Sequence, residues 1–350
     1  MLSEVITLNK ERNVTLTAYI QAVGGEFTTV TKRPVILILP GGGYFGCSDQ
    51  EADPIAFPYL QAGYHVCILR YSVLENAVWP NPLSDFDAAM EYIISKADEW
   101  NLYPDKIAVV GFSAGGHLAA CAASMAKHRP NAAILGYPVI DKETATGFLP
   151  SAPDAADAVD KDTCPCFIFA GRADTTVPVS NSLKMMTALM KYDISYESHI
   201  YAYARHGFGI CNRTRGFEDT DFCNRVPRWV DDSIEWLKDM LGDFGDGKMT
   251  EPKWNRLVNG NHEAFCNMEC TVGHIMQNEN AMEVLSPYFQ TFLDAFHAEE
   301  VPGSFQGLYL REFLGMCQVS GEKFGEIEKV LSTIPNIMEI RLDWKNSTTC

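Results

Sequence analysis

The stretch of sequence that decides the fold is Lys106-Ile-Ala-Val-Val-Gly-Phe-Ser-Ala-Gly-Gly-His-Leu-Ala-Ala120. It starts as an apolar strand, turns through Gly-x-Ser-x-Gly, and continues as a helix of small residues. A strand–turn–helix elbow needs glycine on both sides of the serine, because the turn is tight and the serine backbone is strained. Such an elbow places the Ser113 hydroxyl at a helix N-terminus, clear of the sheet. We therefore predict Ser113 as a nucleophile rather than an incidental serine in a glycine-rich turn.

Strand-like and helix-like segments alternate on both sides of this elbow. Apolar runs and alternating patterns predict strands at residues 14–21, 34–39, 65–71, 106–112, 132–140, 164–170 and 196–204. Helical spacing, small-residue composition and terminal glycines predict helices at residues 54–62, 84–100, 114–127, 182–192 and 227–241. This alternation predicts an α/β fold in which a mostly parallel central sheet carries helices on both faces.

The composition changes at Gly242–Lys248, which is rich in glycine and aspartate. Beyond it, apolar residues recur at helical spacing at residues 281–296, 308–316 and 325–331. We predict a catalytic domain over residues 1–242, a linker over 243–260, and a small mainly helical domain over 261–350. A loop-rich tail is the competing interpretation, which the amphipathic spacing disfavours.

A serine hydroxyl is a weak nucleophile that needs a base, and the base needs an orienting carboxylate. In folds built on this elbow, the chain order is serine, then acid, then histidine. Asp174 follows the predicted strand at 164–170, and His206 follows the one at 196–204. We therefore predict Asp174 as the acid and His206 as the base.

The rival residues occupy less suitable positions. His199 lies inside a strand pattern, and His117 lies one helical turn beyond Ser113, where it suits packing or hydrogen bonding. The rival acids precede the 164–170 strand in a polar loop that we interpret as solvated: Asp154, Asp157, Asp160 and Asp162.

Pro40-Gly-Gly-Gly-Tyr44 follows another predicted strand. Acyl transfer builds negative charge on the substrate carbonyl oxygen, and preorganised backbone N–H groups stabilise that charge. Ala114, the residue after the nucleophile, is predicted to supply one such group. The three glycines would let a second stretch of backbone approach the substrate closely. A phosphate-binding loop is disfavoured, because no G-x-x-x-x-G-K-[ST] motif is present.

Together these motifs resemble the acetyl esterase and acetyl-xylan-esterase-like branch of the α/β-hydrolase superfamily. The resemblance spans about residues 33–241 and rests on Pro40–Tyr44, Pro80-x-Pro82 with Asp85, Gly111–His117, Asp174-x-x-Val-Pro178 and His206–Gly209. It implies the α/β-hydrolase fold, a triad of Ser113, Asp174 and His206, and an oxyanion hole formed by the N–H groups of Gly42, Gly43 and Ala114.

Three further features bear on this resemblance. Related branches have histidine where this chain has Pro40, which implies an acetyl esterase rather than a lipid-type esterase. The segment between Ile140 and Cys164 is shorter than the cap that family members often carry, and it leaves substrate size open. Residues 271–334 are similar to a small helical domain appended to some bacterial carbohydrate-active enzymes.

The predicted function is a serine carboxylesterase that removes short acyl groups, acetyl first, from xylo-oligosaccharides or other acetylated sugars. The resemblance implies an acyl-enzyme intermediate and no cofactor. Tyr44 and Trp79 are predicted to contact the sugar, since flat rings stack on sugar faces, and ordinary packing is an equal alternative. A peptidase or arylformamidase on the same fold is the second hypothesis. A non-catalytic receptor or scaffold is the third.

Composition excludes some classes of partner. The formal net charge of −17 disfavours a nucleic-acid binder, and no apolar run is long enough for a membrane span. We expect no secretory signal at the N-terminus. Several of the eleven cysteines, such as Cys67 and Cys121, lie in apolar patterns, which predicts buried thiols in a reducing cytoplasm. The sequence leaves homo-oligomerisation open.

Four potential zinc ligands recur every four residues: His262, Cys266, Cys270 and His274. On a single helix they would extend over about 18 Å, too far for one tetrahedral site. Gly273 also interrupts the pattern. We therefore predict no metal site here.

Overall fold

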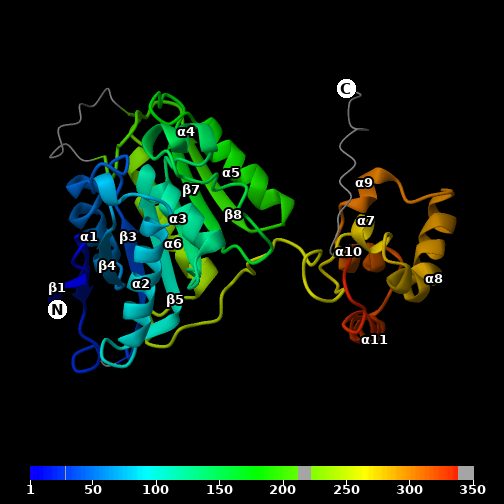
Figure 1. Cartoon of the computed structure of the whole chain (residues 1–350). Coiled ribbons are helices and arrows are strands. Elements are labelled where there is room, and N and C mark those ends of the chain that lie inside the picture. The colour runs from blue at the N-terminus through cyan, green and yellow to red at the C-terminus, as the bar shows by residue number, and fades with distance from the viewer. Residues whose placement is uncertain (28, 212–221, 338–350) are drawn as a thin grey trace. The chain divides into compact units, whose positions relative to one another are not determined.

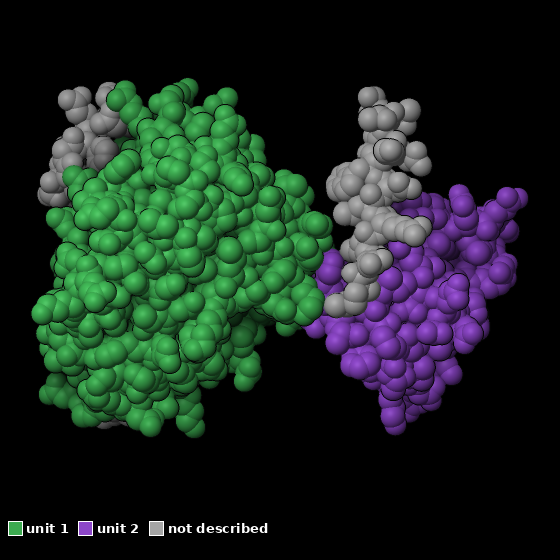
Figure 2. Space-filling view, viewed as in Figure 1, with its two compact units in different colours: residues 1–256 green, residues 257–350 purple. Residues whose placement is uncertain are grey.

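The structure is a computed structural model that describes residues 1–27, 29–211 and 222–337. It divides into two compact units, residues 1–256 and residues 257–350 (Figure 2). The division falls after Arg256, inside the segment that the composition marks as a linker. Each unit has its own apolar core and is described separately.

The first unit is built on one eight-stranded sheet with the order β1-β2-β4-β3-β5-β6-β7-β8 (Figure 1). Strands β1 and β2 run antiparallel to their neighbours, and strands β3 to β8 are parallel. The strands are β1 (Leu2–Asn9), β2 (Val14–Ile20), β3 (Arg33–Leu39), β4 (His65–Arg70), β5 (Leu102–Phe112), β6 (Ala132–Gly136), β7 (Cys166–Gly171) and β8 (Tyr196–Tyr201).

Helices cover both faces of this sheet, as the alternating pattern predicts (Figure 1). They are α1 (Asp53–Gln61), α2 (Asn81–Ser95), α3 (Ala114–Met125), α4 (Lys142–Phe148), α5 (Ser180–Lys191) and α6 (Trp229–Leu241). Helices α1 and α6 share an apolar cluster with alternate strand residues such as Ile36, Val110 and Phe169. Helix α3 packs on β5 and β6, with α2 beside it. Central strands are buried on both faces, which explains their unbroken apolar runs.

The structure corrects several of the predicted elements. Strand β1 was not predicted, because an edge strand with exposed Leu2 and Val5 carries little apolar periodicity. Helix α4, in the segment interpreted only as short and polar, was also missed. Helix α2 starts at Asn81 rather than 84, since Pro82 is well suited to a first helical turn. Strand β6 ends at Gly136 rather than 140.

The parallel strands direct several loops to one edge of the sheet. Leu39 of β3 pairs with Gly111 of β5, so the glycine loop and Ser113 leave neighbouring strands at the same level. Asp174 lies three residues beyond β7, and His206 lies five residues beyond β8. Sites in α/β sheets form at the carboxyl ends of the strands, and the predicted residues gather there.

The second unit is helical, as predicted. It contains α7 (Val272–Ile275), α8 (Glu279–Phe296), α9 (Gly303–Gln306), α10 (Leu310–Met316) and α11 (Gly321–Leu331). Its core gathers apolar residues from these helices and from the turns before them, including Leu285, Phe289, Phe292, Phe313 and Leu331. Phe289 and Phe292 both contact the ring of Phe313.

Two findings concern the described residues as a whole. None of their helices is long and apolar enough to cross a membrane. No disulfide joins their cysteines, most of which are buried.

Candidate active site

Ser113 occupies a strained elbow between β5 and α3. Its backbone has φ 52° and ψ −116°, in the left-handed half of conformational space that L-residues rarely adopt. A Cβ on Gly115 would lie 2.1 Å from the Leu39 carbonyl oxygen, and one on Gly111 would lie 2.3 Å from the Gly115 oxygen. Glycine is therefore required on both sides of the serine, for the steric reason that the motif predicts.

The structure brings Ser113, His206 and Asp174 together. Ser113 Oγ lies 2.8 Å from His206 Nε2, and His206 Nδ1 lies 2.6 Å from Asp174 Oδ2. The second carboxylate oxygen of Asp174 accepts the backbone N–H groups of Thr176 and Val177, each at 2.9 Å. The Asp174 side chain is fully buried, while His206 stays partly exposed.

These contacts fix the tautomer of His206. An ionised carboxylate can only accept hydrogen bonds, so Nδ1 of His206 carries the ring proton and donates a hydrogen bond to Asp174. Nε2 is then the acceptor for the Ser113 hydroxyl. The imidazole is therefore oriented to remove the serine proton, which is the arrangement that a nucleophilic serine requires.

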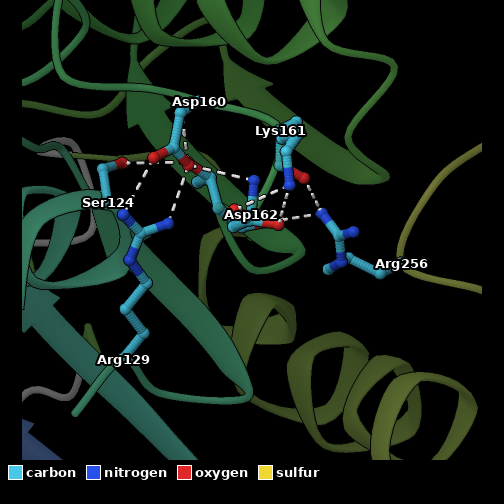
Figure 3. A network of polar contacts seen from close by, with 7 residues as sticks. Ser124, Arg129, Asp160, Lys161, Asp162 and Arg256 are labelled. Atoms are coloured by element: carbon cyan, nitrogen blue, oxygen red, sulfur yellow. Dashed lines mark hydrogen bonds and ion pairs between the residues drawn. The ribbon is translucent and has the colours of Figure 1, made fainter. Parts of the chain in front are cut away.

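Three of the four rival acids have side-chain partners elsewhere in the structure. Asp160 forms a bidentate pair with Arg129 at 2.7 and 2.8 Å, and that guanidinium lowers the pKa of Asp160 (Figure 3). Asp162 forms an ion pair with its neighbour Lys161. The guanidinium of Arg256 donates a hydrogen bond to the Lys161 carbonyl oxygen in the same network (Figure 3). Asp154 pairs with Lys184.

The rival histidines also have other partners. His199 lies on β8 and contacts Glu197 at 2.8 Å. His117 is fully buried on α3, where burial lowers its pKa to about 4. Its Nε2 lies 3.0 Å from the Pro153 carbonyl oxygen and its Nδ1 lies 2.7 Å from the Tyr44 hydroxyl. The His117 side chain therefore joins three segments near the site, and its two ring nitrogens are bonded to groups other than the Ser113 hydroxyl.

The glycine loop lies beside the serine. Gly41 is held on both sides of its backbone: its N–H donates to Glu51 Oε2 at 2.8 Å, and its carbonyl accepts from Ser48 N–H at 2.9 Å. Gly42 and Gly43 follow with φ 131° and 63°. Across from them, Ala114 is the first residue of α3, where a backbone N–H has no acceptor within its own helix. All three predicted donors thus lie in segments adjoining Ser113.

Tyr44 does not present its ring to solvent, contrary to the expectation of a sugar contact. It is only 2% exposed, and the ring packs edge-on against Tyr71 and His117. Its hydroxyl is bonded to His117, so packing is the main role that these contacts support, although Tyr44 also forms part of the wall of the pocket beside the glycine loop. Trp79 is half-buried, and its ring lies edge-on to His117.

A pocket of about 330 Å³ opens next to the glycine loop. Its walls are mainly aromatic and aliphatic, including Phe45, Leu74 and Phe148, and it contains one carboxylate, Glu75. A Cβ on Gly43 would lie 3.1 Å from the Phe45 ring and 3.2 Å from the Phe148 ring. The sequence analysis missed this pocket, because Phe148 comes from the unpredicted helix α4. Phe45, directly after the glycine motif, was the available signal.

The Cys and His residues of the second unit are arranged differently from the prediction. Residues 262–271 are not helical, so the premise of one 18 Å helix was wrong. Cys266 Sγ, Cys270 Sγ and His274 Nε2 instead converge on Asn336 Oδ1, at 3.2, 3.8 and 3.1 Å. Within residues 1–27, 29–211 and 222–337, no group of three or more His, Cys, Asp or Glu side chains is arranged to hold a metal ion.

Two family models match the first unit. A model described as BD-FAE matches residues 27–131, which contain the glycine loop and Ser113. The prolyl oligopeptidase family model matches residues 150–242, which contain Asp174 and His206.

Two curated relatives are similar over the same region. The chain is 28% identical over 214 residues to endo-1,4-beta-xylanase B of Butyrivibrio fibrisolvens. It is 29% identical over 197 residues to an acetylxylan esterase of Xylanibacter ruminicola. The matches cover 52% and 50% of this chain but 33% and 41% of those proteins. The chain therefore spans less than half the length of these relatives.

A solved structure is similar to this chain over almost all of its own length. MGS-M1, an alpha/beta hydrolase enzyme from a Medee basin deep-sea metagenome library, is 41% identical to this chain with a TM-score of 0.63. The match covers 69% of this chain and 98% of that one. Almost all of that solved hydrolase chain therefore has a counterpart in this chain.

Proposed function

This chain belongs to the α/β-hydrolase family, and from that premise we propose that it is a serine carboxylesterase. The proposed reaction is hydrolysis of short-chain acyl esters, acetyl first, on xylo-oligosaccharides or other acylated sugars. The observation that carries the proposal is the continuous hydrogen-bonded series from Ser113 through His206 to Asp174.

In the proposed mechanism, Ser113 Oγ attacks the ester carbonyl carbon while His206 Nε2 takes the hydroxyl proton. The imidazolium then protonates the leaving alcohol as the carbon–oxygen bond to that alcohol breaks. Water, deprotonated by the same nitrogen, hydrolyses the acyl-enzyme and restores Ser113. Asp174 keeps the ring in the required tautomer and stabilises its positive charge in both steps.

The negative charge of each tetrahedral intermediate forms on the former carbonyl oxygen. We assign its stabilisation to the backbone N–H groups of Gly42, Gly43 and Ala114. Removing one donor from such a site typically lowers the rate by about 10²–10³-fold. The bond from the Gly41 N–H to Glu51 supports this assignment, because the donor of the first glycine is already occupied and an oxyanion would have to use the donors of the two glycines that follow.

Two observations support a sugar as the alcohol part of the substrate. A relative named acetylxylan esterase matches half of this chain. The pocket beside Gly43 contains the aromatic ring of Phe45, which is 64% exposed. It also contains the carboxylate of Glu75, which can accept hydrogen bonds from sugar hydroxyl groups. Aromatic faces and hydroxyl acceptors are the two kinds of group that a sugar ring needs.

The test compares p-nitrophenyl acetate, butyrate and octanoate as substrates of wild type and Ser113→Ala. We expect preference for acetate, and a fall of at least about 10³-fold in the variant. Ser124→Ala is the matched control, because Ser124 is also buried on α3 but bonds Thr163 away from the site. Mass spectrometry of acetylated xylo-oligosaccharides, before and after treatment, would show loss of acetyl groups from the favoured sugar.

Other outcomes would contradict parts of this proposal. Undiminished activity in Ser113→Ala would exclude the mechanism, and a preference for octanoate would exclude the acetyl assignment. Cleavage of an aminoacyl anilide or of formylkynurenine without esterase activity would favour a peptidase or an arylformamidase. The match of residues 150–242 to the prolyl oligopeptidase family makes the anilide a necessary comparison.

A further inference from the structure

Glu51 is a buried carboxylate beside the candidate active site that the proposed mechanism does not use. It ends a short 3-10 helix, η1 (Asp49–Glu51), and is 4% exposed. Oε2 accepts the Gly41 N–H at 2.8 Å, and Oε1 accepts the Tyr137 hydroxyl at 2.5 Å. A buried carboxylate is costly unless it is hydrogen-bonded. Here each oxygen is bonded to a different loop of the site.

Tyr137 connects Glu51 to the loop that carries His206. It follows β6, is almost fully buried, and has the unusual backbone φ of 34°. Its hydroxyl oxygen accepts the Gly209 N–H at 3.0 Å. Its ring packs against His206 and Phe208, with centroid separations of 5.1 and 4.6 Å. Tyr137 therefore contacts the His206 loop through both its ring and its hydroxyl.

Gly41 connects Glu51 to the oxyanion loop and to the nucleophile. A Cβ at this position would lie 2.6 Å from Glu51 Oε2 and 3.0 Å from Ser113 Cβ, so the carboxylate packs directly onto the glycine. With its N–H and its carbonyl both bonded, the Gly41 backbone has one orientation. That orientation sets the direction from which Gly42 and Gly43 continue past Ser113.

We propose that Glu51 and Tyr137 are positioning residues, and that the hydrogen-bonded series Gly41–Glu51–Tyr137–Gly209 holds the oxyanion loop and the His206 loop at a fixed separation. We call this series the Glu51–Tyr137 bridge. The inference rests on the proposed function, because an oxyanion arises only if Ser113 attacks an acyl group. Donors and base must both be held within a fraction of an ångström of their working positions, and neither loop is a rigid element by itself.

Tyr137→Phe is the primary test, because it removes only the hydroxyl and keeps the ring against His206 and Phe208. We expect kcat for p-nitrophenyl acetate to fall about 10–100-fold while KM changes less than about threefold, since the bridge acts on the transition state. Glu51→Gln keeps the side-chain volume, but its amide nitrogen cannot accept a hydrogen bond. We expect a similar fall in kcat.

The double variant Glu51→Gln/Tyr137→Phe tests whether the two residues act as one unit. We expect the kcat of the double variant to lie within about threefold of the kcat of the less active single variant. The reason is that either substitution alone already interrupts the bridge. Tyr59→Phe is the matched control. Tyr59 is equally buried, but its hydroxyl bonds Ser233 on α6, away from the catalytic loops. We expect this control to lose stability without losing kcat.

The rate at which a fluorophosphonate probe labels Ser113 gives a readout that does not depend on the ester chosen. We expect slower labelling in both single variants and unchanged labelling in Tyr59→Phe. Wild-type labelling rates and kcat in both single variants would overturn the bridge alone. So would fully additive effects, or an equal fall in the Tyr59 control. A wild type that neither labels nor hydrolyses any ester would instead overturn the proposed function, and the bridge with it.

Discussion

The two units of this chain each gather reactive residue types around one polar group, with opposite results. In the first unit, Asp174 accepts a hydrogen bond from the Nδ1–H group of His206, which leaves Nε2 as an acceptor for the serine hydroxyl. In the second unit, the centre is the neutral amide of Asn336, which accepts from His274 and Cys266. A carboxylate orients a base toward a nucleophile, whereas an amide oxygen only satisfies donors.

The burial of the thiols strengthens this contrast. Burial raises the pKa of Cys266 to about 11 and also raises the pKa of Cys270. Both thiols therefore stay protonated near neutral pH, and the thiolate is the form that attacks substrates or binds metals. Asn336 Nδ2 meanwhile donates to the carbonyl oxygens of Gly260, Glu263 and Phe265. The comparison teaches that residue type alone does not tell whether a His or Cys side chain serves a reaction or only stabilises the fold. The group to which the side chain is hydrogen-bonded decides this.

The largest expected effect separates Asp174 from its former rivals. Asp174→Asn should lower kcat for p-nitrophenyl acetate by about 10⁴-fold, because an amide can stabilise the wrong imidazole tautomer. Asp160→Asn, which removes a charge paired with Arg129, should leave kcat within about twofold of wild type. Steady-state kinetics measure both. Equal losses in the two variants would mean that the carboxylate contact to His206 has no special role.

The second prediction concerns Asn336 and the stability of its unit. Asn336→Ala should lower the free energy of unfolding of residues 257–350 by about 3 kcal/mol or more, since several buried donors and acceptors lose their partner. Calorimetry should show a separate transition at lower temperature, with kcat unchanged. Exposed Gln277→Ala is the control. A loss of activity that matches the loss of structure would show that the second unit takes part in the reaction.

The third prediction concerns how the free energy of unfolding of the first unit changes as the pH falls. His65 is buried, its Nδ1 accepts the Gln21 N–H, and burial lowers its pKa to about 4. Between pH 6.5 and 4 the unfolded chain binds a proton that the folded chain lacks, so stability present above pH 6.5 is lost as the pH falls. The loss amounts to at most about 3 kcal/mol.

Urea unfolding at pH 6.5 and pH 4 measures this effect. His65→Gln should show a smaller decrease in the free energy of unfolding than wild type. Ser124→Ala, at a buried position that carries no titratable group, should show the same decrease as wild type. If the pH dependence of the His65 variant equals that of wild type, other groups account for the acid response.

The smallest effect is expected from removing the second unit altogether. A chain that ends at Arg256 keeps the hydrogen bond from Ser195 N–H to the Arg256 carbonyl. It also contains both regions that the family models match, residues 27–131 and 150–242. We expect it to fold and to retain kcat/KM for p-nitrophenyl acetate within about threefold. A folded truncated chain with more than a tenfold loss would break the contrast between the two units.

Local sequence signals predicted the elements that carry their own periodicity or turn chemistry. The Ser113 elbow, the buried strands and the amphipathic helices were all recognisable, because glycine sterics and apolar spacing are encoded within a few residues. Strand β1 and helix α4 were not, because the first is an exposed edge and the second is a short helix with one fully buried residue.

What the sequence by itself determined is therefore the α/β fold, the helical character of the second unit, and the positions of Ser113, Asp174 and His206 at the ends of strands. Only the tertiary structure decided what each polar group contacts. It buried Tyr44, brought Phe45 and Phe148 to one pocket, and bonded Glu51 to Tyr137. It also brought Cys266, Cys270 and His274 together as hydrogen-bonding partners of the Asn336 amide oxygen. Those outcomes depend on segments far apart in the chain, and local spacing carries no information about which distant groups will meet.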